Sequence, residues 1–139
     1  ATVSYSGYND EDYADRSFIR RVPRLGNPDI ILIFGGINDN RANTPIGEYK
    51  YEDFKRADLY TYRPALAKLI ELAQEHYPNV TLYFIISDDL KTEIVESTKV
   101  VCEHYGIKYV QLQGIEKESG HPTVKGMETI ANQVLTLIK

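Results

Sequence analysis

A chain of 139 residues with 42% apolar and 26% charged residues has the size and composition of one globular domain. Its net charge of −4 disfavours nucleic acid and anionic membranes as partners, because both repel an acidic protein. No apolar run is long enough to span a membrane, and the single cysteine, Cys102, excludes an internal disulfide. The compartment stays open, and a secreted or periplasmic location is compatible with these features if a signal peptide has been removed.

The N-terminal part of the chain predicts one strand and one short helix. Residues 2–6 alternate weakly in polarity and favour β structure, and Gly7 ends that segment. An acidic, aromatic loop follows. Ser17 is suited to cap a helix over residues 17–25, whose length Pro23 limits.

The chain is organised around the stretch from residue 28 to residue 39. Its apolar, β-branched run predicts a strand over residues 29–36 that is covered on both faces, as in parallel sheets. Gly35 and Gly36 allow a sharp turn and a close approach to the backbone. Asn38 then stands at the carboxyl end of the strand, where open α/β sheets bind ligands, and its amide can stabilise an oxyanion. Asp39 is better suited to organise the turn through backbone hydrogen bonds.

The rest of the chain alternates helix and strand. After a long polar connection over residues 38–53, the pattern predicts a helix over 60–76, a strand over 80–86, a helix ended by Gly106, a strand over 107–112 and a helix over 122–138. Asp88 or Asp89 is expected to cap the middle helix, and Pro122 to occupy the first turn of the last one. This alternation predicts one α/β domain over residues 1–139 with a parallel sheet.

His121 is the strongest candidate for acid–base chemistry. It is expected in a loop after the last strand, on the same sheet edge as Gly7 and Asn38, and its imidazole suits general-base work at neutral pH. Glu118, three residues earlier, can accept a hydrogen bond from the other ring nitrogen and fix the tautomer. The alternative is that His121 is only a loop residue at the start of a helix.

Together these motifs resemble those of the SGNH (GDSL-like) family of serine esterases and acylhydrolases. Gly36-Ile37-Asn38-Asp39 is similar to the third block of the family, and Glu118 to Gly126 resembles the last block, Asp-x-x-His-Pro with a later glycine. Ser6-Gly7 is similar to the second block. The resemblance implies a flavodoxin-like three-layer α/β sandwich, with His121 and Glu118 as catalytic residues, Gly7 and Asn38 in the oxyanion hole, and no cofactor. No spacing of His, Cys and Asp in the sequence suggests a metal site. It also implies small acyl esters as substrates, acetylated carbohydrates among them.

The sequence departs from the family pattern at two places. Glu118 stands where the family has aspartate, and the first block, Gly-Asp-Ser, which carries the nucleophile, is absent. We therefore expect an N-terminally truncated domain that is inactive alone, with the nucleophilic serine upstream. In the family the missing strand lies between the strands that correspond to residues 2–6 and 29–36, so its loss predicts an exposed slot in the sheet.

Other serines are poor substitutes for the missing nucleophile. Ser87 ends a strand and precedes a helix, but it lacks the flanking glycines of a nucleophile elbow. Ser4 and Ser6 precede Gly7 instead of following a strand, and Ser119 lies in the loop of His121. Glu116 is a weaker alternative to Glu118.

Two further features leave the function open. Four tyrosines lie in and after the long polar connection: Tyr49, Tyr51, Tyr60 and Tyr62. Their rings could stack on a sugar, although a role as partly buried structural tyrosines is commoner. The alternative to a hydrolase is a non-catalytic α/β binding module that holds a carbohydrate or anionic ligand through Gly7, Asn38 and His121. Exposed sheet edges would make a homo-oligomer feasible in either case.

Overall fold

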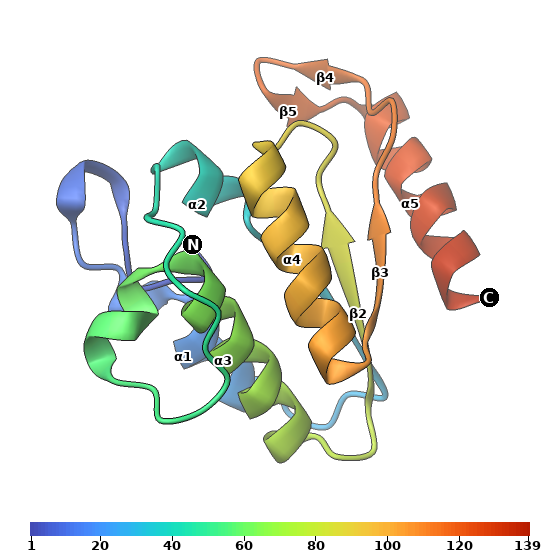
Figure 1. Cartoon of the computed structure of the whole chain (residues 1–139). Coiled ribbons are helices and arrows are strands. Elements are labelled where there is room, and N and C mark those ends of the chain that lie inside the picture. Colours follow the sequence, from blue (N-terminus) through green and yellow to red (C-terminus); the bar gives the residue numbers. More distant parts are fainter.

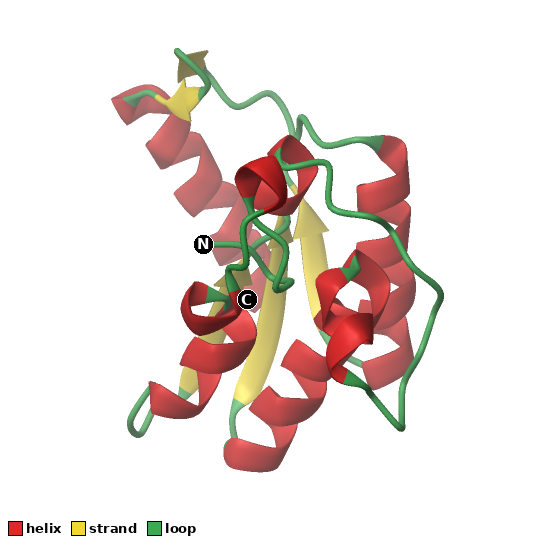
Figure 2. Ribbon diagram, turned by 90° about the vertical axis from the view of Figure 1, so that its left-hand side faces the viewer, coloured by secondary structure: helices red, strands yellow, loops and turns green.

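A three-stranded parallel sheet forms the centre of the computed structural model, which describes all 139 residues (Figure 1). The strands stand in the order β1–β2–β3 and comprise Ile30–Phe34, Thr81–Ile86 and Lys108–Gln111. Helices α3 (Tyr62–His76) and α4 (Thr92–Tyr105) cover one face, whereas α5 (Val124–Ile138) packs against β3 on the other (Figure 2). The predicted α/β fold with a parallel sheet between helices is confirmed.

Short elements fill the connections. They are α1 (Phe18–Arg21), α2 (Ile37–Arg41), the two-stranded antiparallel hairpin β4 (Lys117–Glu118) and β5 (His121–Pro122), and 3-10 turns over Tyr8–Asp10, Ala14–Arg16, Val22–Arg24 and Arg56–Tyr60. The expected loop over residues 38–53 therefore begins as a short helix. None of the helices combines the length and the hydropathy needed to cross a bilayer.

The main core lies between the sheet and helices α3 and α4. Ile31 and Ile33 of β1 pair in register with Leu82 and Phe84 of β2, so all four side chains point to this face. A smaller apolar cluster lies under α5 and consists of Ile85, Leu112, Ile115 and Val134. The sheet thus has a thick core on one face and a thin one on the other.

Strand β1 is covered on one face only, so the prediction of a strand buried on both faces is wrong. Its residues alternate between buried and exposed, and Ile30, Leu32 and Phe34 are 47%, 45% and 37% exposed. The cause is the position of α5, which packs over β3 and leaves the β1 end of the same face uncovered. An apolar surface along an edge strand is the result.

Residues 2–6 do not form the predicted strand. No neighbouring strand pairs with them, and the backbone N–H groups of Val3 and Ser4 donate instead to the Asp39 carboxylate. Only Ser6 makes an isolated antiparallel bridge, to Asp12. A side chain of α2 thus takes the place of a sheet ladder for this segment.

Predictions for helix starts succeeded in one case and failed in two. Ser17 caps α1 by accepting from the backbone N–H of Arg20, as expected. Neither Asp88 nor Asp89 caps α4, because both carboxylates contact Lys117 instead. The prediction for the last helix is also wrong, since Pro122 lies in β5 and Thr123 caps α5.

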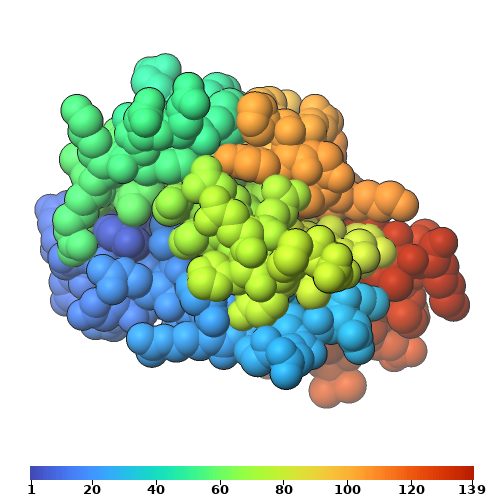
Figure 3. All heavy atoms as spheres, turned by 90° about the horizontal axis from the view of Figure 1, so that it is seen from below, coloured from blue at the N-terminus to red at the C-terminus, as the bar shows by residue number.

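Two features lie at the end of the sheet opposite the carboxyl ends of the strands: the end of α4 and a contact between α3 and the segment before β1. Gly106 ends α4 in the left-handed conformation, with φ +69°, which confirms its predicted role. Below the sheet, the segment that leads into β1 lies beside the end of α3 (Figure 3). The Tyr77 hydroxyl joins them by accepting from Leu25 N at 2.9 Å and donating to Val22 O at 2.8 Å.

Candidate active site

A cavity of about 250 Å³ opens at the carboxyl end of the sheet, between α2 and the β4–β5 hairpin. The turn after β1, the end of β2 and the hairpin all contribute to its wall. Its polar side chains are Asn38, Arg41, Ser87, Asp89, Lys117 and His121. Asn38 and His121, which are 83 positions apart in the sequence by their numbers, thus face one space.

The start of α2 positions Asn38. Gly36 precedes the helix with φ +91°, and a Cβ at this position would lie only 2.9 Å from the Tyr62 hydroxyl, so glycine is required. The Asn38 side chain is half-buried and has partners at both ends of its amide. Its Nδ2 donates to the carbonyl of Ala1 at 2.8 Å, and its Oδ1 accepts from the Tyr8 hydroxyl at 3.1 Å.

Asp39, next to Asn38, is a buried anchor for the N-terminal segment. Its carboxylate accepts hydrogen bonds from Val3 N at 2.7 Å, from Ser4 N at 3.1 Å and from the Ser4 hydroxyl at 2.6 Å. Burial raises the pKa of Asp39, and the hydrogen bonds from Ser4 and Val3 oppose that rise. Asp39 does accept backbone hydrogen bonds, but from the distant residues Val3 and Ser4, so the prediction that it organises its own turn is wrong.

His121 lies in the β4–β5 hairpin, not in a loop. It is the register partner of Glu118, so the two side chains share one face of the hairpin, and both are exposed. No hydrogen bond joins them, and Glu118 does not line the cavity. Arg41 holds the hairpin turn by donating from Nη2 to the carbonyl of Gly120 at 3.0 Å.

An ion-pair cluster contributes Lys117 and Asp89 to the wall of the cavity. Lys117 Nζ contacts the Asp88 carboxylate and lies 3.2 Å from Asp89 Oδ2. Burial acts to lower the pKa of Lys117, but the hydrogen bonds with Asp88 and Asp89 outweigh it and leave the pKa raised. Asp88 also accepts from the backbone of Ile115 at 2.9 Å, so the cluster ties the loop after β2 to the hairpin.

Residues 1–138 match the family model of GDSL-like lipases and acylhydrolases. The chain belongs to this family. No curated protein matches it. The order of the sequence motifs and the place of Asn38 and His121 in one cavity agree with that membership.

Two solved structures from Bacteroides are strongly similar. A GDSL-like protein of Bacteroides ovatus is 49% identical, with a TM-score of 0.97, and the match covers 99% of this chain and 66% of that one. A GDSL-like protein of Bacteroides uniformis is 46% identical, with a TM-score of 0.97 and coverage of 98% and 64%. This chain therefore spans a little under two thirds of the length of either protein.

A more distant neighbour has the same fold. It is a family two carbohydrate esterase from Clostridium thermocellum, 15% identical to this chain, with a TM-score of 0.68 and coverage of 99% and 46%. At this identity the likeness concerns the arrangement of helices and strands only.

Gly7, expected in the oxyanion hole of this family member, lies outside the cavity wall. Its N–H donates to the carbonyl of Glu11 at 2.8 Å, within the turn that follows residue 6. A Cβ on Gly7 would lie 2.3 Å from the ring of Tyr13, so this glycine allows close packing of the turn. The structure brings together Asn38 and His121, and it leaves Gly7 and Glu118 at the periphery.

No serine hydroxyl is bonded to His121 in this family member. Ser87 lines the cavity, but it is only 4% exposed and its hydroxyl donates to Asp89 Oδ1 at 2.7 Å. Ser4 is buried on Asp39, and the Ser6 hydroxyl donates to the carbonyl of Tyr60. The hydroxyl groups of these serines are therefore engaged elsewhere.

The tyrosines singled out in the sequence do not form a wall of the cavity. Tyr62 is fully buried and bonded to Thr98, at 2.7 Å. The ring of Tyr51 stacks on His104 at 3.6 Å, and the Arg63 guanidinium lies 4.2 Å from the ring centre of Tyr49. Tyr62 is thus out of reach of a ligand, and one ring face of Tyr51 and one of Tyr49 are occupied by groups of the same chain, which favours a structural role.

Sequence reasoning missed Tyr8 and Lys117 as parts of the site. Neither residue belongs to a family motif, and each reaches the site only through a long-range contact, with Asn38 in one case and with Asp88 and Asp89 in the other. The acidic residues after β2 were visible in the sequence, but the pattern predicted helix caps.

Proposed function

We propose that this domain is part of a serine ester hydrolase in which His121 and Asn38 act on an ester bound between them. The observation that carries the proposal is that both residues line one cavity, in a member of the GDSL-like lipase/acylhydrolase family. His121 serves as general base and acid, and Asn38 donates to the oxyanion. Glu118 is the candidate for orienting the imidazole. Gly7 completes the oxyanion hole only in a conformation in which its N–H releases the carbonyl of Glu11.

The chemistry is an acyl transfer through a serine. His121 removes the proton of the serine hydroxyl as its oxygen attacks the ester carbonyl, and then gives that proton to the leaving alcohol. Negative charge develops on the carbonyl oxygen, and an N–H of Asn38 Nδ2 stabilises it. In the second half-reaction His121 removes a proton from water as the water oxygen attacks the acyl-serine carbonyl. The same proton then passes to the serine oxygen, and the acid product is released.

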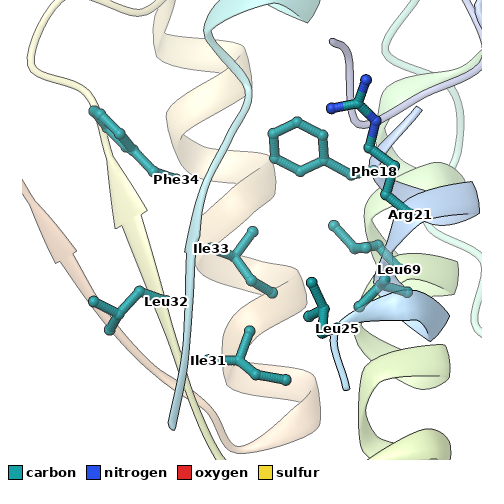
Figure 4. Close-up of a pocket in the computed structure, with 9 residues that line it drawn as sticks. Phe18, Arg21, Leu25, Ile31, Leu32, Ile33, Phe34 and Leu69 are labelled. Atoms are coloured by element: carbon teal, nitrogen blue, oxygen red, sulfur yellow. The ribbon is translucent and has the colours of Figure 1, made fainter. Parts of the chain in front are cut away.

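We infer that the serine comes from a segment outside these 139 residues, and that without it the domain is inactive. An apolar groove of about 330 Å³ runs along β1, and its lining is apolar except for Arg21 (Figure 4). Ile31 and Ile33 point to one side of the strand, whereas Leu32 and Phe34 point to the other. The groove therefore wraps around the free edge of the sheet.

A further parallel strand fits this groove. It would pair with the free backbone edge of β1 and cover apolar side chains that are now in contact with water. Its carboxyl end would lie at the same sheet edge as Asn38, where a serine could approach His121. The greater length of the two Bacteroides proteins supports such an addition.

Small acyl esters are the substrate class that we propose, with acetylated carbohydrates among them. The cavity of about 250 Å³ is small, and polar side chains such as Asn38, Arg41 and His121 share its lining with apolar groups. A small cavity of this mixed character suits a short acyl chain on a hydroxyl-rich alcohol better than a long lipid. The carbohydrate esterase with the same fold is a reason to include sugar acetates among the test substrates.

Hydrolysis of p-nitrophenyl acetate tests the proposal. The 139-residue chain is compared with the natural protein that includes any residues preceding Ala1, and both are treated with a serine-directed phosphonate. We expect turnover and labelling only in the longer protein, at a serine upstream of Ala1. Labelling of Ser87 in the short chain would contradict the inferred origin of the nucleophile.

A binding module is the second candidate. Arg41 lines the cavity and forms no ion pair with a carboxylate, so its charge is available to an anionic ligand. A longer protein that is folded, is not labelled by the phosphonate and still binds anionic sugars would support this candidate and contradict the hydrolase.

A further inference from the structure

Tyr8 contacts Asn38 without lining the cavity. We propose that Tyr8 is a positioning residue, which holds the Asn38 amide with its nitrogen available to the reacting carbonyl. The proposal rests on the proposed function, because that function makes Asn38 the oxyanion donor. It adds a residue from the N-terminal turn to the machinery of the site.

The orientation of the amide decides whether Asn38 helps or hinders. A carboxamide turned by 180° about its last bond presents oxygen where nitrogen stood, and an oxygen facing an oxyanion repels it. The two orientations occupy the same volume, so packing alone does not select one. Hydrogen-bond partners at both ends of the amide are needed.

The structure supplies one partner at each end. The carbonyl of Ala1 only accepts, so the atom that faces it at 2.8 Å must be Nδ2. Oδ1 is then at the other end, and the Tyr8 hydroxyl donates to it at 3.1 Å. Nδ2 carries two protons, and the Ala1 carbonyl takes one, so the second remains for the substrate.

A tight turn presents the Tyr8 hydroxyl to Asn38. Gly7 N donates to Glu11 O at 2.8 Å, and Glu11 N donates to Tyr8 O at 3.0 Å. The Tyr8 ring packs edge-on against Tyr13, with 6.2 Å between ring centres. Gly7 allows the close approach of the Tyr13 ring that this turn requires.

Asp39 fixes the turn relative to α2. Its carboxylate binds the backbone of Val3 and Ser4, between Ala1 and Tyr8 in the chain. Both partners of the Asn38 amide are thus anchored through the residue next to Asn38 itself. Tyr8 therefore has a fixed position from which its hydroxyl can act.

The test compares three variants of the natural protein on p-nitrophenyl acetate: Tyr8→Phe, Asn38→Ala and the double variant. We expect Tyr8→Phe to lower kcat about five- to tenfold, with KM and melting temperature nearly unchanged, because only one hydrogen bond is lost. Asn38→Ala should lower kcat by about 10²- to 10³-fold. The double variant should be no slower than Asn38→Ala, since Tyr8 acts only through that amide.

Tyr13→Phe is the matched control, because Tyr13 lies in the same turn and its hydroxyl makes no hydrogen bond. The kcat of this variant should equal that of the unaltered protein. Unchanged kcat in Tyr8→Phe, or losses that multiply in the double variant, would overturn the proposal. A protein without any turnover would contradict the proposed function instead. The NMR signals of the Asn38 side-chain amide then decide the role of Tyr8: they shift in Tyr8→Phe but not in Tyr13→Phe if Tyr8 holds the amide, and a Tyr8→Phe spectrum without a shift refutes it.

Discussion

Glu118 and His121 face each other across the β4–β5 hairpin, yet no hydrogen bond links their side chains. Both are exposed to water, which weakens any interaction between them. The carboxylate is thus close enough to join the imidazole when substrate binds, without being locked to it beforehand. This arrangement gives the two residues very different expected weights in catalysis.

We predict that Glu118→Gln in the natural protein lowers kcat/KM by less than about tenfold, because electrostatic interactions between solvent-exposed side chains contribute little. His121→Ala should lower it by at least about a hundredfold, since the general base is lost. Hydrolysis of p-nitrophenyl acetate measures both. A loss in Glu118→Gln as large as that in His121→Ala would mean that the carboxylate is essential.

Gly126 is expected to resist a substitution that helices usually favour. Alanine in place of glycine within a helix stabilises by about 0.5–1 kcal/mol. A Cβ on Gly126, however, would lie 2.1 Å from the carbonyl oxygen of Glu116, where α5 meets the hairpin strand. Gly126→Ala should therefore lower the melting temperature measured by circular dichroism. Glu128→Ala, on an exposed position of the same helix, is the control and should leave it unchanged.

The hydrogen bonds of Asp39 predict a loss of stability in Asp39→Asn. The change replaces an acceptor oxygen by an NH₂ group that faces donors from Val3 or Ser4, and we expect a cost of about 1–3 kcal/mol. Denaturant unfolding measures it. Stability equal to that of the unaltered protein would show that the N-terminal segment is held by other contacts.

The lowered pKa of Asp89 predicts how the stability of the fold changes with pH. Burial acts to raise the pKa of Asp89, but hydrogen bonds from Ser87 and Lys117 outweigh it, so the pKa is lowered. A lowered pKa means that the stabilisation is present above the ordinary aspartate pKa of 3.8 and is lost as pH falls through the folded value. Asp89→Asn should therefore lower the melting temperature at neutral pH, with a difference that shrinks below about pH 4.

A pH-independent difference would exclude the ion pair as the cause. Asp29→Asn, at an exposed carboxylate without a hydrogen-bond partner, is the control for the loss of one negative charge. It should show no such dependence on pH.

Much of the fold was predictable because it rests on local patterns. The apolar run before Gly35 and the left-handed turn at Gly106 each act within a few residues, and the structure has both. The predicted strand over residues 2–6 is absent because no neighbouring strand is available to pair with it. The Asp39 carboxylate accepts the backbone hydrogen bonds of Val3 and Ser4 instead. Propensity alone does not reveal whether a partner strand is available.

Only those site residues that belong to sequence motifs were predictable. Asn38 and His121 were found from their sequence context, and the sheet brings them to one cavity. Tyr8 and Lys117 join the site through side-chain contacts with distant residues, for which single-sequence reasoning has no signal. The hairpin that carries His121 was predicted as a loop because two-residue strands have no periodicity to detect.

The free edge of β1 has a consequence for amide hydrogen exchange. In a parallel sheet, alternate residues of a strand bond to the neighbour on either side, and β1 has a neighbour on one side only. Every second amide of Ile30–Phe34 is therefore open to deuterium, while its neighbours are protected by β2. Uniform protection along β1 would instead indicate that another segment is paired with its free edge. The exchange pattern of these five residues thus reports whether a further strand has been added to the sheet.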